Sequence, residues 1–210
     1  MTSPNNTSDM TPDLAFKLLQ TGHERFLSGK TIQRNLLKEM QHSRQEPQPF
    51  ATILGCMDSR TPAELIFDQG MGAIFNLRIA GNIVTPHILG SLEFSIEIAR
   101  AKLIVVMGHS DCAAVKSACN HVTTEHFSCL LHEISVCLPQ EFTEISNRTG
   151  NNEIFVNKVA LLNVHRSVQQ LLERSSIIRQ FADSGKIKII PAMYDVSTGA
   201  VTFHTSEQGV

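Results

Sequence analysis

The sequence predicts an α/β fold built on a mostly parallel β-sheet, with about four parallel strands plus an antiparallel edge strand, flanked by helices and preceded by an N-terminal helical arm. Short β-branched runs alternate with turns and with longer segments of helical apolar spacing between residues 50 and 118. This rhythm is typical of parallel strands joined by crossover helices. Near the end of the chain, two apolar runs flank the turn residues Asp195–Gly199, which predicts a hairpin and therefore one antiparallel edge strand.

Composition predicts one globular domain that acts on small molecules. The chain has 210 residues, 42% apolar content and a formal charge of only -2, which provides a sizeable core and no basic field for nucleic acid. The first residues resemble no signal peptide, and no apolar run approaches about 18 residues, so we expect no membrane partner and a cytoplasmic location. Five cysteines in such a chain favour free thiols and metal ligands over a disulfide framework.

The N-terminal region divides into a leader, a helix and an arm. Residues 1–12 are rich in Ser, Thr, Asn and Pro and are expected to be a disordered leader to a single domain of residues 13–210. Apolar residues recur at helical spacing over residues 13–27, and Gly29 follows as a stop signal. Residues 31–48 are mostly polar, and we expect a short helix or an extended arm, with a neighbouring subunit as one candidate for the surface it covers.

The rest of the chain supplies the sheet and its helices. Compact apolar runs predict strands, while apolar residues three and four apart predict helices. The expected strands are residues 50–54, 73–79, 103–107, 186–193 and 201–203. The expected helices are residues 62–67, 89–101, 113–118, 155–172 and 175–181, with residues 120–152 as a partly helical insertion over the sheet.

Metal-binding residue types follow two of the predicted strands. Cys56 comes directly after the first strand, and His109 and Cys112 follow the third in an H-x-x-C spacing. Parallel strands end at one edge of a sheet, so these side chains converge if the two strands are neighbours. Thiolate and imidazole select zinc, and three protein ligands leave a fourth position for water. We therefore predict one catalytic Zn²⁺ per chain. His126 and Cys129 have the same spacing but no preceding strand, which argues against a site there.

A carboxylate and a guanidinium lie in the same turn as Cys56. Asp58 and Arg60 follow the thiol by two and four residues, and a bidentate contact would hold Asp58 ionised and oriented as a catalytic hydrogen-bond acceptor. If Arg60 releases it, Asp58 becomes a possible fourth metal ligand in a closed state. The sequence does not choose between these states, and a plain salt bridge that braces the turn is the simpler alternative.

These motifs resemble the β-class carbonic anhydrases. The similarity is carried by C-M-D-S-R at residues 56–60, FDQGMGAIFNLRIAGN at residues 67–82 and G-H-S-D-C at residues 108–112, and it extends over nearly the whole chain. The resemblance implies reversible hydration of carbon dioxide to bicarbonate and a proton, by attack of zinc-bound hydroxide. It also implies zinc on Cys56, His109 and Cys112 beside the Asp58/Arg60 dyad, and a homodimer or homotetramer with the cleft at the subunit interface.

The resemblance further implies a small apolar substrate pocket. Its residues would be Gln48, Phe75, Ala80, Phe94 and Ala113, although Phe75 and Phe94 could equally be plain core. Two positions depart from the family pattern. Thr61 stands where most members have Val, and Ala113 stands where Gly is usual. If residue 113 needs a positive φ, alanine there would be strained by roughly 1 kcal/mol.

Two other functions remain open at this point. A second enzyme on the same zinc chemistry would hydrolyse carbon disulfide or carbonyl sulfide, and pocket width would decide the substrate. A non-enzymatic protein with a structural zinc site would need four protein ligands. That alternative leaves the Asp58/Arg60 dyad unexplained.

Overall fold

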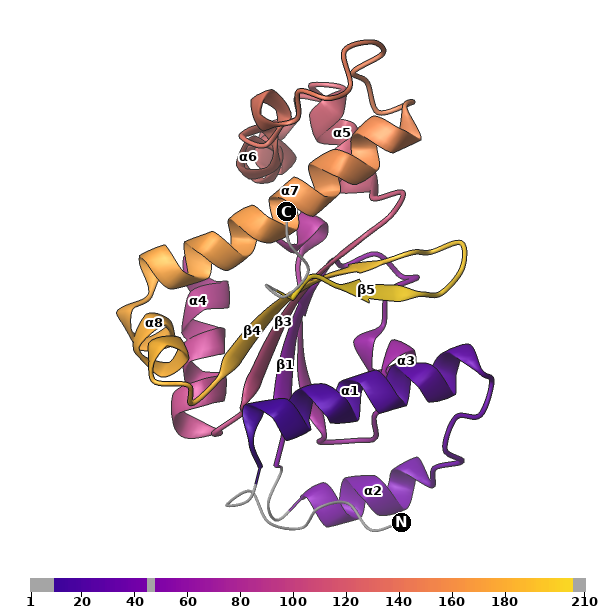
Figure 1. Ribbon diagram of the computed structural model, residues 1–210, viewed down its shortest axis with the longest axis vertical. Coiled ribbons are helices and arrows are strands. Elements are labelled where there is room, and N and C mark those ends of the chain that lie inside the picture. The colour runs from indigo at the N-terminus through magenta and orange to yellow at the C-terminus, as the bar shows by residue number, and fades with distance from the viewer. Residues whose placement is uncertain (1–9, 45–47, 206–210) are drawn as a thin grey trace.

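The computed structural model describes residues 10–44 and 48–205, and its centre is a five-stranded sheet in the order β2-β1-β3-β4-β5 (Figure 1). The strands are β1 (Ala51–Gly55), β2 (Ile74–Arg78), β3 (Leu103–His109), β4 (Lys188–Tyr194) and β5 (Val201–Phe203). The pairs β1–β2, β1–β3 and β3–β4 are parallel, and β5 runs antiparallel to β4. The predicted sheet is thereby confirmed.

The adjacent strands β1 and β3 position the residues that carry the predicted metal site. Every residue of β1 and β3 is buried, as expected of parallel strands that helices cover on both faces. Gly55 at the end of β1 is in register with Met107 of β3. The residues that follow each strand therefore emerge side by side at one edge of the sheet.

One face of the sheet is covered by α1 (Pro12–Leu27). Thr11 caps this helix by accepting a hydrogen bond from the backbone N–H of Leu14, and Ala15 and Leu19 pack into a core beneath it. The helix and its cap begin inside the stretch predicted to be leader. The helix starts one residue earlier than predicted, because the Thr-Pro start signal outweighs the polar composition around it. Residues 1–9 of the leader lie outside the described part of the chain.

The predicted arm contains a short helix, α2 (Leu36–Ser43), which has no buried residue among those described. Its Glu39 carboxylate accepts a hydrogen bond from the backbone N–H of Met71 at 3.1 Å. Another short helix, α3 (Ala63–Ile66), follows the turn after β1. The arm is therefore held by a polar contact and leaves its apolar side chains uncovered in a single chain.

The opposite face is covered by α4 (Pro86–Glu93), α7 (Glu153–Arg174) and α8 (Ser176–Asp183) (Figure 1). The single helix predicted over residues 89–101 is instead α4 followed by a π-helical turn, η3 (Phe94–Ile98). There the backbone N–H of Ala99 bonds to the carbonyl oxygen of Phe94, five residues earlier. The wider turn rotates Phe94 and Ile98 to the surface.

A third group of helices closes the end of the sheet where the metal-binding residues emerge. It contains α5 (Ala113–Cys119) and α6 (Glu125–Ser135), with the short turns η2 (Ala80–Asn82) and η4 (Leu138–Gln140). The core that these helices share with α7 includes Cys56 and Cys112. The partly helical insertion predicted for residues 120–152 thus lies over this end (Figure 1). Within the described ranges, no helix is long and apolar enough to cross a membrane.

Candidate metal centre

Two thiols and one imidazole come together at the carboxyl ends of β1 and β3. Cys56 follows β1, His109 is the last residue of β3, and Cys112 is the N-cap of α5. Their candidate ligand atoms lie within 4.8 Å of one another, and all three residues are buried. The sequence separation of 56 residues between the two cysteines is closed by the parallel pairing of β1 with β3.

The imidazole of His109 is oriented for a cation. Its Nδ1 lies 2.9 Å from the carbonyl oxygen of Ser110, to which it must donate a proton. The lone pair is therefore on Nε2, which is buried and has no hydrogen-bond partner among the described residues. An orphaned acceptor beside two thiols fits a bound metal ion, because coordination would satisfy it.

The pKa values of the two thiols shift in opposite directions. Their sulfur atoms are 4.0 Å apart, and the backbone N–H of Gly81 donates to the Cys56 sulfur at 3.4 Å. The hydrogen bond with Cys112, the nearby imidazole of His109 and the N–H of Gly81 lower the pKa of Cys56. The pairing with Cys56 and burial raise the pKa of Cys112. One thiolate is thus favoured in the free protein, and a cation such as zinc would deprotonate the other.

A carboxylate lies beside the three ligands and is held by an arginine. Arg60 binds Asp58 in a bidentate manner, with Nε to Oδ1 at 2.9 Å and Nη2 to Oδ2 at 2.8 Å. These contacts lower the pKa of Asp58 to about 2. Oδ2 of Asp58 is 4.0 Å from Nε2 of His109. An ionised acceptor is therefore held close to the metal group.

The turn that contains Cys56 and Asp58 is braced through its carbonyl oxygens. Arg78 donates to the carbonyl oxygens of Cys56, at 3.0 Å, and of Asp58. The Thr61 hydroxyl lies 3.2 Å and 3.0 Å from the same two oxygens. Thr61 is buried, so the departure from valine adds a hydrogen bond to the turn.

The predicted pocket residues fall into two groups. Ala80 directly precedes Gly81, which contacts Cys56, and Ala113 is the exposed first residue of α5. Because Ala113 is helical, the positive φ considered for that position does not occur there. The left-handed residue of this turn is Asp111, with φ 58°.

The aromatic group lies further from the ligands. Phe75 and Phe94 pack edge to face with ring centroids 6.2 Å apart. Phe75 is in register with Thr52, four residues before Cys56, or roughly 13 Å along the strand. Gln48 is exposed just before β1. The structure therefore does not bring Phe75 next to the metal group of its own chain.

Sequence reasoning missed an acidic residue of this site. Asp111 binds the same guanidinium as Asp58, with its Oδ2 3.0 Å from Nη1 of Arg60. The available signal was its place between the two ligands of the H-S-D-C motif.

The remaining cysteines do not add to the metal group. Cys119 and Cys137 are buried, which raises the pKa of each to about 11. Cys129 is exposed on α6, and the nearby His126 side chain is 95% exposed. In the part of the chain that the structure describes, no cysteine forms a disulfide.

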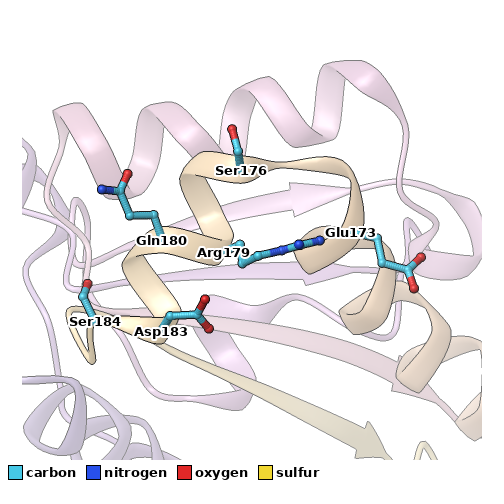
Figure 2. Close-up of a pocket in the computed structure, with 6 residues that line it drawn as sticks. All are labelled: Glu173, Ser176, Arg179, Gln180, Asp183 and Ser184. Carbon is cyan, nitrogen blue, oxygen red and sulfur yellow. The ribbon is translucent and has the colours of Figure 1, made fainter.

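One surface hollow lies away from this chemistry. It has a volume of about 590 Å³ and lies on α8 and the end of α7 (Figure 2). It is lined by Glu173, Ser176, Arg179, Gln180, Asp183 and Ser184. This open polar surface contains neither a thiol nor an imidazole.

Comparison with known proteins identifies the family. A sequence model described as carbonic anhydrase matches residues 51–201. The carbonic anhydrase of Mycolicibacterium smegmatis is 32% identical over 192 residues, covering 90% of this chain and 92% of that protein. Carbonic anhydrase 2 of Mycobacterium tuberculosis is 32% identical over 191 residues, covering 90% of each chain.

Solved structures share the fold. The β-carbonic anhydrase CafA of Aspergillus fumigatus has a TM-score of 0.69 at 23% identity, over 82% of this chain and 88% of that one. A tetrameric β-carbonic anhydrase from Sordaria macrospora has a TM-score of 0.68 at 21% identity, over 91% of this chain and 98% of that one. With the family match and the relatives above, these findings show that the chain belongs to the β-class carbonic anhydrases.

Proposed function

We propose that the protein catalyses the reversible hydration of carbon dioxide, CO2 + H2O to HCO3⁻ + H⁺, with one zinc ion per chain held by Cys56, His109 and Cys112. The observation that carries this proposal is the buried, unpartnered Nε2 of His109, which lies within 4.8 Å of two thiol sulfurs. When bound, zinc makes hydroxide available from water near neutral pH.

The residues of the chain would hold and orient the reactants. His109 presents Nε2 because its Nδ1–H is bonded to Ser110, and the N–H of Gly81 stabilises the Cys56 thiolate. Asp58, kept ionised by Arg60, can accept a hydrogen bond from solvent at the site and so fix its orientation. We propose this Arg60-bound arrangement as the active one, and a carboxylate that turns to the metal as the closed one.

The substrate pocket is proposed to form between subunits. Carbon dioxide is linear and uncharged, so a small apolar slot beside Ala80 and Ala113 suits it. Phe94 is 52% exposed and packs on Phe75 at an edge of the sheet, away from its own metal group. We propose that these rings, with Gln48, line the site of a partner copy in a homodimer or homotetramer.

The proposed location is the cytoplasm. All five cysteines are free thiols, and two of them must stay reduced to act as ligands. A reducing compartment preserves that state.

Metal analysis combined with a stopped-flow hydration assay tests the function. Protein purified with zinc should contain one zinc ion per chain and accelerate acidification of a carbon dioxide solution. Removal of the zinc by a chelator should abolish the rate, and added zinc should restore it. A metal-free preparation with full turnover would refute the proposal.

A parallel assay separates the alternative substrates. The same preparation should release no sulfide from carbon disulfide or carbonyl sulfide at a rate comparable to hydration. Dominant sulfide release would assign the chain to the other substrate class. Bound zinc with neither activity would favour a structural site.

A further inference from the structure

The guanidinium of Arg60 is shared by two carboxylates. Nε and Nη2 bind Asp58, while Nη1 donates to Oδ2 of Asp111 at 3.0 Å and Nη2 also reaches the Asp111 carbonyl oxygen at 3.2 Å. Asp58 follows β1 and Asp111 follows β3, so Arg60 ties together the two turns that carry the metal ligands. The pair predicted from the sequence is in fact part of a three-residue cluster.

Asp111 is itself held from two sides. Its Oδ1 binds the ammonium group of Lys116 on α5, and its backbone N–H donates to Oδ1 of Asn157 on α7 at 3.1 Å. Its backbone is left-handed, with φ 58°, a conformation that Asp and Asn adopt more readily than most residues. The second anchor of Arg60 therefore has a fixed position between His109 and Cys112.

We propose that Asp111, held by Lys116, is a positioning residue that fixes the orientation of Arg60 and thereby keeps Asp58 turned away from the metal. An arginine bound to a single carboxylate can move together with that carboxylate as one unit. The contact with Asp111 fixes the plane of the guanidinium, and the bidentate contact transmits this constraint to Asp58. This inference rests on the proposed function, because it concerns the carboxylate beside the proposed zinc site.

A purely structural role makes different predictions. The side chains of Arg60, Asp111 and Lys116 are each 37–43% exposed, and exposed ion pairs contribute little to folding. If the cluster only braced the turns, its loss would lower thermal stability, metal retention and turnover together. If it positions Asp58, turnover should fall while folding and metal retention are preserved.

The test uses Asp111→Asn in the zinc-loaded protein. Asparagine keeps the shape of the side chain and tolerates the left-handed backbone, but it lacks the charge that Arg60 and Lys116 bind. We expect kcat for carbon dioxide hydration to fall about tenfold, with an unchanged melting temperature and unchanged or slower loss of zinc to a chelator. Lys116→Met should reduce kcat less, and the double variant should be no worse than Asp111→Asn alone.

Cobalt substitution provides a readout that does not depend on activity. In Asp111→Asn, the visible spectrum of the cobalt-loaded protein should change, because the released Asp58 carboxylate can reach the metal. Adding Asp58→Asn should restore the spectrum of the wild-type protein. Asp183→Asn, which removes an exposed charge on α8, serves as the control and should leave turnover and spectrum unchanged.

The outcomes separate this inference from the proposed function. Wild-type turnover and spectrum in Asp111→Asn would overturn the positioning role, and so would parallel losses of turnover, melting temperature and zinc. If wild-type protein loaded with zinc fails to hydrate carbon dioxide, the proposed function fails first. The cobalt spectra still test the contact between Asp111 and Asp58 in that case.

Discussion

At the scale of single residues, the metal group and the carboxylate beside it should be separable by substitution. Cys56→Ser should lose zinc and hydration activity together, because it removes one of three ligands. Asp58→Asn should retain zinc yet lose activity by about ten- to a hundredfold, the usual effect of removing a hydrogen-bond partner next to a metal. Zinc content and stopped-flow rates measure both.

The control for this comparison is Cys129→Ser. Cys129 is an exposed thiol on α6, so its loss should change neither zinc content nor rate. Equal loss of zinc in Cys56→Ser and Asp58→Asn would mean that Asp58 is an obligatory ligand, contrary to the arrangement proposed above.

A buried histidine far from the metal group should make folding stability depend on pH. The Nδ1 of His23 donates to the carbonyl oxygen of Ile66 at 3.1 Å, and its Nε2 accepts the backbone N–H of Val201 at 2.9 Å. The contact with Val201 requires the neutral ring, because a protonated Nε2 cannot accept a hydrogen bond, and burial lowers the pKa of His23 below its ordinary value of 6.5. Stability from this group is therefore present above pH 6.5 and lost as the pH falls through the lower folded-state pKa.

Urea unfolding at several pH values and fixed protein concentration checks this expectation. Between pH 7 and pH 5, the free energy of unfolding should decrease more in the wild-type protein than in His23→Gln, which cannot titrate. At pH 7, the variant should be less stable by about 1–3 kcal/mol because buried backbone groups lose a partner. Parallel pH profiles for the two proteins would contradict the assignment.

At the scale of elements, the turn η2 depends on a glycine that touches both the metal group and α6. Gly81 has φ 69°, its N–H binds the Cys56 sulfur, and a Cβ there would be 2.5 Å from Cδ1 of Ile134. Gly81→Ala should therefore combine backbone strain of about 1–2 kcal/mol with overpacking of about 1–3 kcal/mol. We expect a lower melting temperature and faster zinc loss to a chelator.

Gly185 offers a matched control for this substitution. It has φ 67°, and nothing lies within 4 Å of an added Cβ. Gly185→Ala should lower the melting temperature through backbone strain alone and leave zinc retention unchanged. If the two variants behaved alike, the close approach to Ile134 and Cys56 would have no measurable role.

The sequence predicted the elements that carry the site because their signals are local. The buried runs of β1 and β3 and the proline start of α3 at Pro62 are visible in short windows. The turn at Phe94 was missed because a π-helical turn adds one residue without changing which residues are apolar. The start of α1 lies one residue before the predicted one because the polar composition of residues 1–12 masks the cap at Thr11.

Within the site, contacts inside one motif were predictable from the sequence, whereas contacts between two motifs were not. Asp58 and Arg60 share one turn, so their pairing follows from spacing. The contact of Arg60 with Asp111 joins residues 51 apart and depends on how closely the turns after β1 and β3 approach. The contacts of Arg78 with the carbonyl oxygens of Cys56 and Asp58 also join distant residues. They depend on the pairing of β1 with β2, which short windows of sequence do not show.

At the scale of the whole molecule, the single chain leaves the apolar side chains of α2 exposed. Leu36, Leu37 and Met40 of α2 are 55%, 70% and 47% exposed. An eight-residue helix without buried side chains is marginal by itself in water. Association with a second copy would bury these residues and explain why an amphipathic helix is retained at the end of the arm.

Disrupting this surface should change the oligomeric state. Leu37→Glu places a charge where we expect apolar burial between copies, so sedimentation at micromolar concentration should show a smaller assembly than the wild type. Ile145→Glu makes the same change at a side chain that is 89% exposed in the loop between α6 and α7, and it should sediment as the wild type does. If the proposed pocket forms between subunits, hydration activity per bound zinc should fall in Leu37→Glu alone. A smaller Leu37→Glu assembly with full activity would instead place the whole catalytic site within one chain.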